Sequence, residues 1–387
     1  MISKIIISFL LLNIYLLNAQ IEELSFGTED TFEVMTWNIE HFPKNGQSTV
    51  EYVSEIIEAL EVDLIAIQEV DNINYFEQMV GGLSNYSGYL ESSWFAGLAY
   101  IYNPNVVQIN DIYEIYTSSQ YWSAFPRAPM VMDLNYLDNR IIIINNHLKC
   151  CGDGILDLTD SGDQETRRYQ ANLLLKEYID TNFPNENVIL LGDLNDDITD
   201  LPQHNVFQMF LNDSENYAFT DFEIASGSSS NWSYPSWPSH LDHILITNEL
   251  FEEFENNESE ISTIKIDEYL TNGWSEYDEN ISDHRPVALK LMIDSNLNSN
   301  DITISNSAFF NVPNPFHSET IFRLSNSIEH FEIDIFNING QKVSIIRRQI
   351  GQNSLKWNAE GFPSGVYIAK LKTNNHYINT IKLVLMN

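Results

Sequence analysis

Cysteine, basic side chains and long apolar runs are all scarce in this chain of 387 residues. It has two cysteines, Cys150 and Cys151, and they are adjacent. Two thiols exclude the disulfide framework of a small secreted domain. A bond between neighbouring cysteines is strained, so we expect the pair either to stay reduced or to form that strained bond, and we give it no catalytic role.

Basic residues are outnumbered: 19 Lys and Arg stand against 55 Asp and Glu, for a formal net charge of −36. A surface of this sign repels nucleic-acid backbones and anionic membranes unless cations intervene. The hydrophobic fraction of 43% is ordinary for a globular protein. The length allows one large domain and a smaller one.

Apolar runs are short except near the N-terminus, where residues 1–19 are typical of a signal peptide. Lys4 supplies the positive charge and an apolar run covers residues 5–12. Ala19 offers a small residue for cleavage before Gln20. A membrane anchor is the alternative, but the run is too short and asparagines interrupt the segment. No later run is longer, so we expect no transmembrane segment and a soluble protein outside the cytoplasm.

Buried strands are plentiful, and several end in polar residues. The run V-I-L-L at residues 188–191 fits a strand that is buried on both faces. Gly192 then allows a sharp turn at the end of the strand. Asp193 and Asn195 follow two residues apart, so in extended chain their side chains lie on one side and could grip a metal, a water or a phosphate. A surface turn after a core strand is the alternative.

Strands and helices alternate along the first three quarters of the chain. Helices are predicted at residues 50–60 and 166–183. Further strands are predicted at residues 32–37, 62–69, 95–102, 129–134, 140–147, 241–247 and 286–293. This order indicates layered sheets covered by helices, an α/β fold. Polar residues at so many strand ends indicate a site assembled there, and the Ser-, Trp- and Pro-rich loop at residues 225–240 is expected nearby.

Composition and charge change around residues 294–305, where the sequence D-S-N-L-N-S-N-D indicates a linker. Residues 20–305 hold 10 basic and 50 acidic residues, a net charge of −40. Residues 306–387 hold 8 basic and 5 acidic residues, a net charge of +3. We therefore expect a large domain at residues 20–293 and a small all-β domain, with short strands between turns, at 306–387.

Six short polar segments stand at the predicted strand ends of the large domain. They are Trp37-Asn38, Gln68-Glu69, Asn146-His147, Gly192-Asp193-Leu194-Asn195, Leu241-Asp242-His243 and Ser282-Asp283-His284-Arg285-Pro286. Each alone has a structural explanation as a helix cap, a core histidine or a surface charge. Together, and in this order, they resemble the endonuclease/exonuclease/phosphatase superfamily. That group includes deoxyribonuclease I-like nucleases, abasic-site endonucleases, inositol-polyphosphate phosphatases and secreted sphingomyelinases.

The resemblance covers residues 32–293 and implies a four-layer α/β sandwich of two packed mixed β-sheets flanked by helices. It also implies a catalytic Mg²⁺, or else Mn²⁺ or Ca²⁺. Glu69 is then the main metal ligand, and Asn38 and Asp283 help to hold the ion. Oxygen ligands of this kind suit a hard divalent cation.

The same resemblance assigns catalytic roles. His284 faces the scissile phosphate, and Asp242 orients it and keeps it charged. Asp193 and Asn195 position and activate the attacking water, and Asn195 also steadies the phosphate. His147 matches a second histidine that donates to a phosphate oxygen. The chemistry agrees, because hydrolysis needs a placed water and positive charge around phosphorus. A metal and two imidazoles would supply that charge, and a neighbouring carboxylate raises the pKa of a histidine.

One segment departs from the superfamily. In the nuclease branch the segment at residues 126–129, here P-R-A-P, carries an acid that supports His147. Ala128 stands in place of that acid, so the role of His147 as acid or base is open. Arg127 is still expected to contact the substrate phosphate. His243 lies on the other side of its strand from the site, so we expect it to be structural.

The C-terminal residues resemble the sorting domain of the type IX secretion system. The matching motifs are V-P-N-P-F at residues 312–316, F-N-I-N-G-Q-K-V at 336–343 and G-V-Y-I-A-K-L at 365–371. The resemblance implies export across the outer membrane by the type IX machinery, then release or attachment at the cell surface. A carbohydrate-binding or spacer β-module is the alternative.

Three functions remain open from the sequence. The first is an exported metal-dependent phosphodiesterase of the nuclease type, acting on nucleic acid. The second is a sphingomyelinase-like phospholipid hydrolase or an inositol-phosphate hydrolase, which the net charge of −40 favours because nucleases usually carry a basic groove. The third is a non-catalytic surface binding protein. Basic residues gather only in the middle of the chain, at Arg127, Arg140, Lys149, Arg167 and Arg168. The oligomeric state is left open.

Overall fold

The structure is a computed structural model, which describes residues 21–91, 96–293, 309–324, 332–338, 340–347, 354–373 and 376–386. The predicted signal peptide and linker lie outside the described residues. The chain forms two compact units, Met1–Asn296 and Leu297–Asn387. Within the part of the chain that is described, no helix has the length and apolar character needed to cross a membrane.

Two six-stranded mixed sheets form the centre of the first unit. In order across the sheet, sheet I contains β11 (Glu260–Thr263), β12 (Val287–Leu291), β1 (Phe32–Phe42), β2 (Leu64–Val70), β4 (Gly97–Tyr102) and β3 (Ser87–Leu90). Sheet II contains β5 (Gln108–Glu114), β6 (Met130–Tyr136), β7 (Asn139–His147), β8 (Asn187–Asp193), β10 (Asp242–Thr247) and β9 (Tyr217–Phe219). Each sheet has one parallel pair, β1 with β2 and β7 with β8, and its other neighbours are antiparallel.

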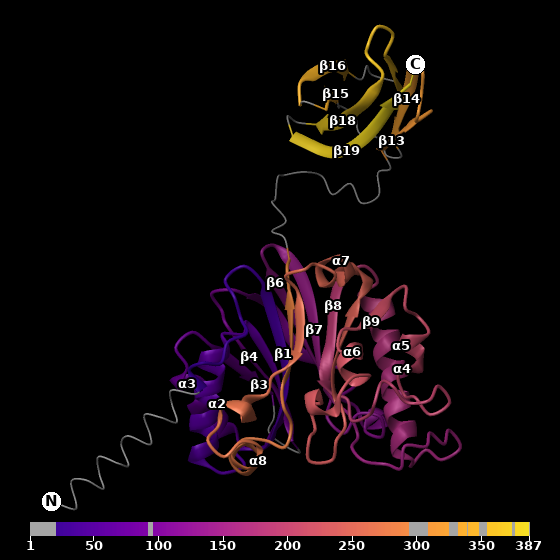
Figure 1. Ribbon diagram of the computed structural model, residues 1–387. Coiled ribbons are helices and arrows are strands. Elements are labelled where there is room, and N and C mark those ends of the chain that lie inside the picture. The colour runs from indigo at the N-terminus through magenta and orange to yellow at the C-terminus, as the bar shows by residue number, and fades with distance from the viewer. Residues whose placement is uncertain are drawn as a thin grey trace, which may run out of the picture. The chain divides into compact units, whose positions relative to one another are not determined.

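Helices cover the outer faces of both sheets. Sheet I is covered by α2 (Gln47–Leu60), α3 (Ile73–Gly82) and α8 (Trp274–Asn280), and sheet II by α4 (Gln164–Asn182) and α5 (Gln208–Leu211). Figure 1 shows α2 and α3 on one flank of the sheets and α4 and α5 on the other. The expected four-layer α/β sandwich is confirmed. Shorter helical segments lie in the connections: η1 (Ser119–Tyr121), α6 (Phe222–Ala225), η2 (Ser229–Asn231), η3 (Asn248–Leu250), α7 (Phe251–Phe254) and η4 (Ile266–Tyr269).

Strands buried on both faces explain the apolar runs in the sequence. Along β1, Val34 packs into the core between the sheets, whereas Met35 and Trp37 pack under the helices of sheet I. Helix α2 buries Ile56 and Leu60 against the same outer face. Each such side chain contributes about 1.5–3 kcal/mol by leaving water, so both faces of these strands must be apolar.

The register of the strands brings the polar strand ends together. Asn38 pairs with Gln68 across the β1–β2 ladder, and Asp193 pairs with both His147 and Asp242 in sheet II. The β1–β2 register also shifts just beyond Asn38. One edge of each sheet therefore presents polar side chains.

Gly192 does not turn the chain, as the sequence suggested, because it lies inside β8. Its φ is +145°, and a Cβ there would lie 1.9 Å from the carbonyl oxygen of Asn146 on β7. The requirement for glycine is close packing of two parallel strands. Asn195 is not extended either: its φ is +57°. Its backbone N–H donates to Asp193 Oδ1 at 3.1 Å, which is the contact that holds the turn.

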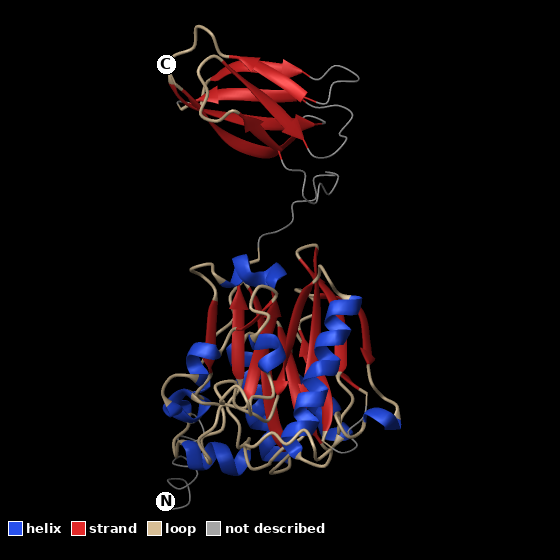
Figure 2. Cartoon of the chain, turned by 90° about the vertical axis from the view of Figure 1, so that its right-hand side faces the viewer, coloured by secondary structure: helices blue, strands red, loops and turns tan. Residues whose placement is uncertain are grey.

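The second unit is all-β, as expected. One sheet contains β13 (Phe309–Val312), β14 (Glu319–Leu324) and β17 (Ser354–Asn358). The other contains β16 (Lys342–Arg347), β15 (Glu332–Asn337), β18 (Gly365–Thr373) and β19 (His376–Leu385). Figure 2 shows the described residues of this unit as strands and loops. Its core includes Phe322, Ile333, Trp357, Leu371 and Leu383.

Candidate active site

Asp193 lies at the centre of the predicted site. Its Oδ2 accepts a hydrogen bond from Asn38 Nδ2 at 3.0 Å and lies 3.4 Å from His147 Nε2 and 3.8 Å from His284 Nε2. The residue is 2% exposed. Burial raises the pKa of Asp193 to about 7, against the opposing charge of His284. Asp193 therefore connects the ends of β1, β7 and β8 with the loop before β12.

His284 forms a buried pair with Asp242, at 2.7 Å between Nδ1 and Oδ2. Burial disfavours the charged imidazole, but the charges of Asp242 and Asp193 outweigh it and raise the pKa of His284 to about 10. The ring of Tyr234 lies against that of His284, with centroids 4.8 Å apart. His284 is therefore an imidazolium at neutral pH, with Nε2 directed toward Asp193.

His147 is different, which corrects the expectation of two charged imidazoles. Burial, followed by the positive charge of Arg127, holds its pKa well below the ordinary value. Its Nδ1 is buried and, among the described residues, has no hydrogen-bond partner. His147 is therefore a neutral donor or acceptor rather than a cation.

The three predicted metal ligands meet at the edge of sheet I. Glu69 Oε1 accepts from Asn38 Nδ2 at 3.2 Å, and Glu69 Oε2 accepts from the backbone N–H of His41 at 3.0 Å. Asp283 is held nearby, because its backbone N–H donates to Glu40 Oε2 at 2.9 Å. Carboxylates of Glu69, Asp193 and Asp283 line one cavity, and their oxygen atoms are the type of ligand that a hard divalent cation prefers.

Asn38 is the least suitable of the three as a ligand. Its amide nitrogen faces Glu69 and Asp193, while its Oδ1 accepts the backbone N–H of Glu40 at 3.0 Å. To offer oxygen to a cation, the amide would have to rotate. The group at this site whose ligand atoms lie within 4.8 Å of one another comprises Asp193, Asp242 and His284. In that group His284 Nδ1 is already engaged by Asp242.

A cavity of about 550 Å³ opens over these side chains. The predicted residues that line it are Glu69, His147, Asp193, Asn195, Asp283 and His284. Asn38 and Asp242 are buried behind this lining. Further lining residues that the sequence analysis did not assign to the site are Glu40, Cys150, Cys151, Tyr234 and Trp237. Tyr234 and Trp237 come from the Ser-, Trp- and Pro-rich loop, whose composition was the one available signal for them.

Arg127 lines a neighbouring cavity, also of about 550 Å³, instead of this one. Cys150 lines both. Burial lowers the pKa of Arg127, while the charges of Glu69 and Asp193 act in the opposite direction. The guanidinium is therefore close enough to the site for its charge to act there, but it belongs to the adjoining hollow.

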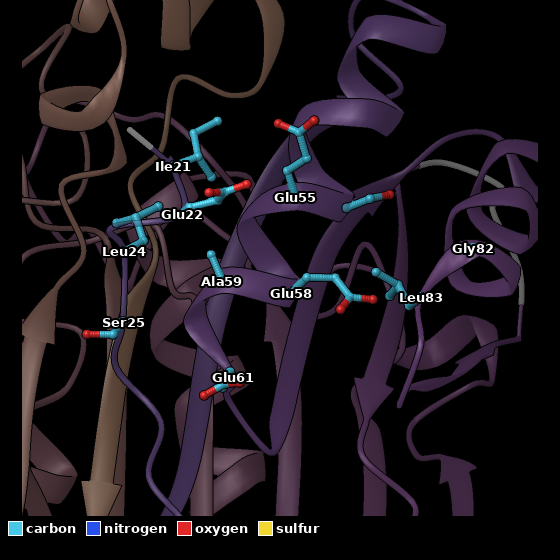
Figure 3. Close-up of a pocket in the computed structure, with 11 residues that line it drawn as sticks. Ile21, Glu22, Leu24, Ser25, Glu55, Glu58, Ala59, Glu61, Gly82 and Leu83 are labelled. Atoms are coloured by element: carbon cyan, nitrogen blue, oxygen red, sulfur yellow. The ribbon is translucent and has the colours of Figure 1, made fainter. Parts of the chain in front are cut away.

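A third cavity, of about 610 Å³, lies away from the histidines (Figure 3). The segment before β1 contributes Ile21 and Leu24, and α2 contributes Glu55 and Glu58. None of the residues predicted for the site lines it. Its size therefore gives no reason to place the chemistry there.

Some residues of the motif S-D-H-R-P line the cavity, and others hold the loop in place. Ser282 Oγ donates to the carbonyl oxygen of Asn38 at 2.6 Å and accepts the backbone N–H of His284 at 3.0 Å. Arg285 donates two hydrogen bonds to Asp267, at 2.8 and 2.7 Å. Ser282 and Arg285 thus fix the loop between α8 and β12, and they leave Asp283 and His284 at the cavity.

Five residues at the site have a positive φ although they are not glycine. They are Glu40 (34°), His41 (49°), Glu69 (66°), Cys151 (72°) and Asn195 (57°). Such conformations are uncommon and are held by surrounding contacts at functional sites. Residue propensities do not predict a glutamate at positive φ. The sequence therefore identified Glu69 as a site residue but could not predict its backbone conformation.

The class of the first unit follows from comparison with known families. A model of the endonuclease/exonuclease/phosphatase family matches residues 35–284. The chain belongs to this family. It is therefore a metal-dependent phosphoric-ester hydrolase. A second model, of a secretion system C-terminal sorting domain, matches residues 312–386. The second unit is thus a type IX sorting domain, which indicates secretion to the cell surface or the medium.

Solved structures of the endonuclease/exonuclease/phosphatase fold resemble the first unit. A D. rerio TDP2 humanised by 14 mutations gives a TM-score of 0.52 at 12% identity, covering 68% of this chain and 99% of that one. D. rerio TDP2 with a single strand DNA product gives 0.51 at 11% identity, with the same coverage of 68% and 99%. A comparison with curated protein sequences finds no match. At identities this low, the structural likeness establishes the fold and leaves the substrate open.

Proposed function

We propose that the first unit is an exported phosphodiesterase of the nuclease type, which cleaves a phosphodiester by attack of water. The observation that supports this best is the pairing of a charged His284 with Asp193 in a cavity that Glu69 also lines. An anionic phosphate needs positive donors, and water needs an acceptor for its proton. These two residues offer both within 3.8 Å of each other.

The protein residues have distinct roles in this proposal. His284 donates from Nε2 to a phosphate oxygen, and Asp242 fixes its orientation through Nδ1. Asp193 orients the attacking water and, with a pKa raised to about 7, accepts its proton. Asn195 steadies the phosphate with its amide. His147 stays neutral and donates from Nε2 to another phosphate oxygen.

Glu69 and Asp283 are the residues proposed to hold Mg²⁺, or in its place Mn²⁺ or Ca²⁺, with Asn38 as a further ligand after rotation of its amide. When bound, the cation would polarise the phosphate and lower the pKa of water. Glu69 is fixed for this task by the backbone N–H of His41, while its bond from Asn38 Nδ2 would be given up when that amide rotates. Asp283 is fixed through its backbone by Glu40.

The proposed export of the protein depends on segments at both ends of the chain. Residues 1–19 act as a signal peptide for the first export step. The sorting domain then engages the type IX machinery for passage across the outer membrane, and the enzyme is released or attached to the surface. The proposed substrate is nucleic acid, met outside the cell.

A second candidate, a phospholipid or inositol-phosphate hydrolase, is favoured by two observations. Residues 20–305 carry a net charge of −40, and Trp237 at the cavity rim is 78% exposed. An exposed indole beside the site suits a lipid interface. The negative charge suits a substrate with one phosphate better than a polyanion.

A substrate panel separates the two candidates. The full chain is supplied with Mg²⁺ and given plasmid DNA, RNA, sphingomyelin and an inositol phosphate in parallel, with His284→Gln as the inactive reference. The proposal predicts cleavage of DNA or RNA that His284→Gln loses. Hydrolysis of sphingomyelin or inositol phosphate with intact nucleic acid would replace it by the second candidate.

A further inference from the structure

The cavity next to the active site gathers positive charge on a strongly acidic unit. Arg127, Lys149 and Arg167 line it, three of the ten basic residues of the large domain. One acidic residue, Glu114, shares the lining. Cys150 lines both cavities, so the two hollows adjoin at this residue. A ligand that reaches from one to the other passes from acidic to basic surroundings.

Two of these cations are oriented by backbone oxygen rather than by a carboxylate. Lys149 Nζ donates to the carbonyl oxygen of Cys150 at 3.0 Å, and Arg167 Nε donates to that of Ser123 at 2.6 Å. A carbonyl orients a cation without neutralising it. The remaining mid-chain arginines differ: Arg140 is paired with Asp133 at 2.7 Å, and Arg168 with Asp196 at 2.8 Å. These last two are committed to the protein itself.

The other wall of the cavity is aromatic. Tyr116 and Phe125 stack with centroids 5.1 Å apart and ring planes 9° apart. Trp122 lines the same cavity and is 64% exposed, with its Nε1 donating to the carbonyl oxygen of Thr117 at 3.3 Å. The indole is anchored at one edge and its ring faces remain accessible. Exposed aromatic rings beside cations are the surface on which single-stranded nucleic acids bind.

We propose that this aromatic–basic pocket, lined by Tyr116, Trp122, Arg127, Lys149 and Arg167, binds the nucleotide that flanks the scissile phosphodiester. Lys149 and Arg167 contact its phosphate, and its base stacks on Trp122. The inference rests on the proposed function and narrows its substrate to nucleotides in single-stranded form. A phospholipid head group or an inositol phosphate brings a phosphate but no flat ring, so it would leave the aromatic wall unused.

The test compares two substrates on the full chain with Mg²⁺. One is a short single-stranded oligodeoxynucleotide. The other is methyl 4-nitrophenyl phosphate, which has one phosphate and no flanking nucleotide. In Trp122→Ala, and separately in Arg167→Gln, the ratio of kcat/KM for the oligonucleotide to that for the small diester is expected to fall about tenfold, through KM. Arg167→Lys keeps the charge and should recover part of the loss.

Arg140→Gln is the matched control, because it removes one positive charge at the opposite end of β7 and its ratio should equal that of the wild type. Thermal unfolding monitored by circular dichroism confirms that each variant is folded. If Arg167→Gln is not folded, the result for Trp122→Ala alone decides the test. Ratios unchanged in folded variants would overturn the pocket assignment and leave the proposed function standing. A wild type that cleaves only the small diester would overturn both the pocket assignment and the nucleic-acid substrate, and would leave only the hydrolase activity. A wild type inactive on both would remove the proposed function and this inference with it.

Discussion

Two histidines approach the same carboxylate of Asp193, yet they differ in charge. His284 has Asp242 at 2.7 Å, which outweighs the cost of burial and raises its pKa. His147 has no such partner for its Nδ1 within the described structure, and burial, followed by the nearby charge of Arg127, lowers its pKa. One ring can therefore act as a fixed positive charge and the other as a neutral donor. The difference arises from neighbours that are remote in sequence.

Asp242→Asn should shift the alkaline limb of the pH profile. In the wild type His284 stays protonated until the pH approaches about 10, so activity that needs the imidazolium persists to that range. Removing the charge of Asp242 lowers the pKa toward the ordinary value of 6.5. The profile of kcat/KM against pH, measured with a small diester, should then fall nearer neutrality. Asp133→Asn, a carboxylate away from the site, should keep the wild-type profile, and an unmoved limb in Asp242→Asn would refute the assignment.

His243 is predicted to support the fold rather than the chemistry. Its Nδ1 lies 2.6 Å from Asp221 Oδ2 and its Nε2 lies 2.8 Å from the carbonyl oxygen of Asp196. Both ring nitrogens face acceptors, so the ring is an imidazolium paired with a fully buried carboxylate. His243→Leu leaves that carboxylate without its main partner and should lower the free energy of unfolding by about 3–5 kcal/mol in urea titrations. His240, 3.1 Å from the same carboxylate, remains in place.

The double variant Asp221→Leu/His243→Leu is the control for this prediction. If the loss comes from an unpaired buried charge, the double variant should be more stable than His243→Leu alone. Equal losses in the single and double variants would indicate a packing effect. The ion pair would then have no part in stability.

At the scale of single elements, β1 carries a buried acid whose titration should be visible in stability. Burial raises the pKa of Glu33 to about 8, with Asp63 adding to the shift and the hydroxyl of Thr31 opposing it. The folded state therefore holds a proton that the unfolded chain has released above about pH 4.5. Its unfolding free energy should fall as the pH rises from about 4.5 to about 8.

Glu33→Gln removes this titration, so the variant should lose less stability than the wild type over that range. Urea unfolding at a series of pH values measures it. Glu51→Gln, at an exposed position of α2, is the control and should follow the wild type. Parallel curves for the wild type and Glu33→Gln would contradict the raised pKa.

The central strands were predictable because a strand that is buried on both faces has a continuous run of apolar residues. The runs before Asp193 and in front of His147 gave β8 and β7 closely. Edge strands leave no such signal: β5 reads Q-I-N-D-I-Y-E and is largely exposed, and β9 has three residues. Neither was predicted, and the short β3, β11 and α3 were also missed.

The site was predictable in its residue types and less so in its geometry. Glu69, Asp193 and His284 stood out because core strands have no need of charged ends. Their charge states, the positive φ of Glu69 and the contact of Tyr234 with His284 depend on contacts between distant segments. The role of Gly192 was also predicted wrongly. The sequence suggested a turn, but glycine is required because a carbonyl group of β7 leaves no room for a side chain.

At the scale of the whole molecule, charge divides the chain. Residues 20–305 carry −40 and the sorting domain +3, so the catalytic unit acts on a phosphate against its own long-range field. Screening should therefore help a polyanionic substrate. Raising NaCl from about 20 to about 200 mM shortens the Debye length and should increase kcat/KM for an oligonucleotide.

Methyl 4-nitrophenyl phosphate, with a single charge, is the control and should respond little to the same salt. Initial rates at limiting substrate give both values. A decrease of the oligonucleotide rate with salt would be the behaviour of an enzyme that attracts nucleic acid through counterion release. It would show that the aromatic–basic pocket, rather than the net charge, governs encounter.

The measurement that tests the account most directly is hydrolysis of methyl 4-nitrophenyl phosphate by the full chain, first stripped with EDTA and then supplied with Mg²⁺. Convergence of Glu69 and His284 on one cation-holding cavity predicts no activity after EDTA and recovery with Mg²⁺. It predicts rates at least about 100-fold lower in Glu69→Gln and in His284→Gln, with Arg140→Gln at the wild-type rate. Hydrolysis that survives EDTA, or a Glu69→Gln variant as fast as the wild type, would contradict it.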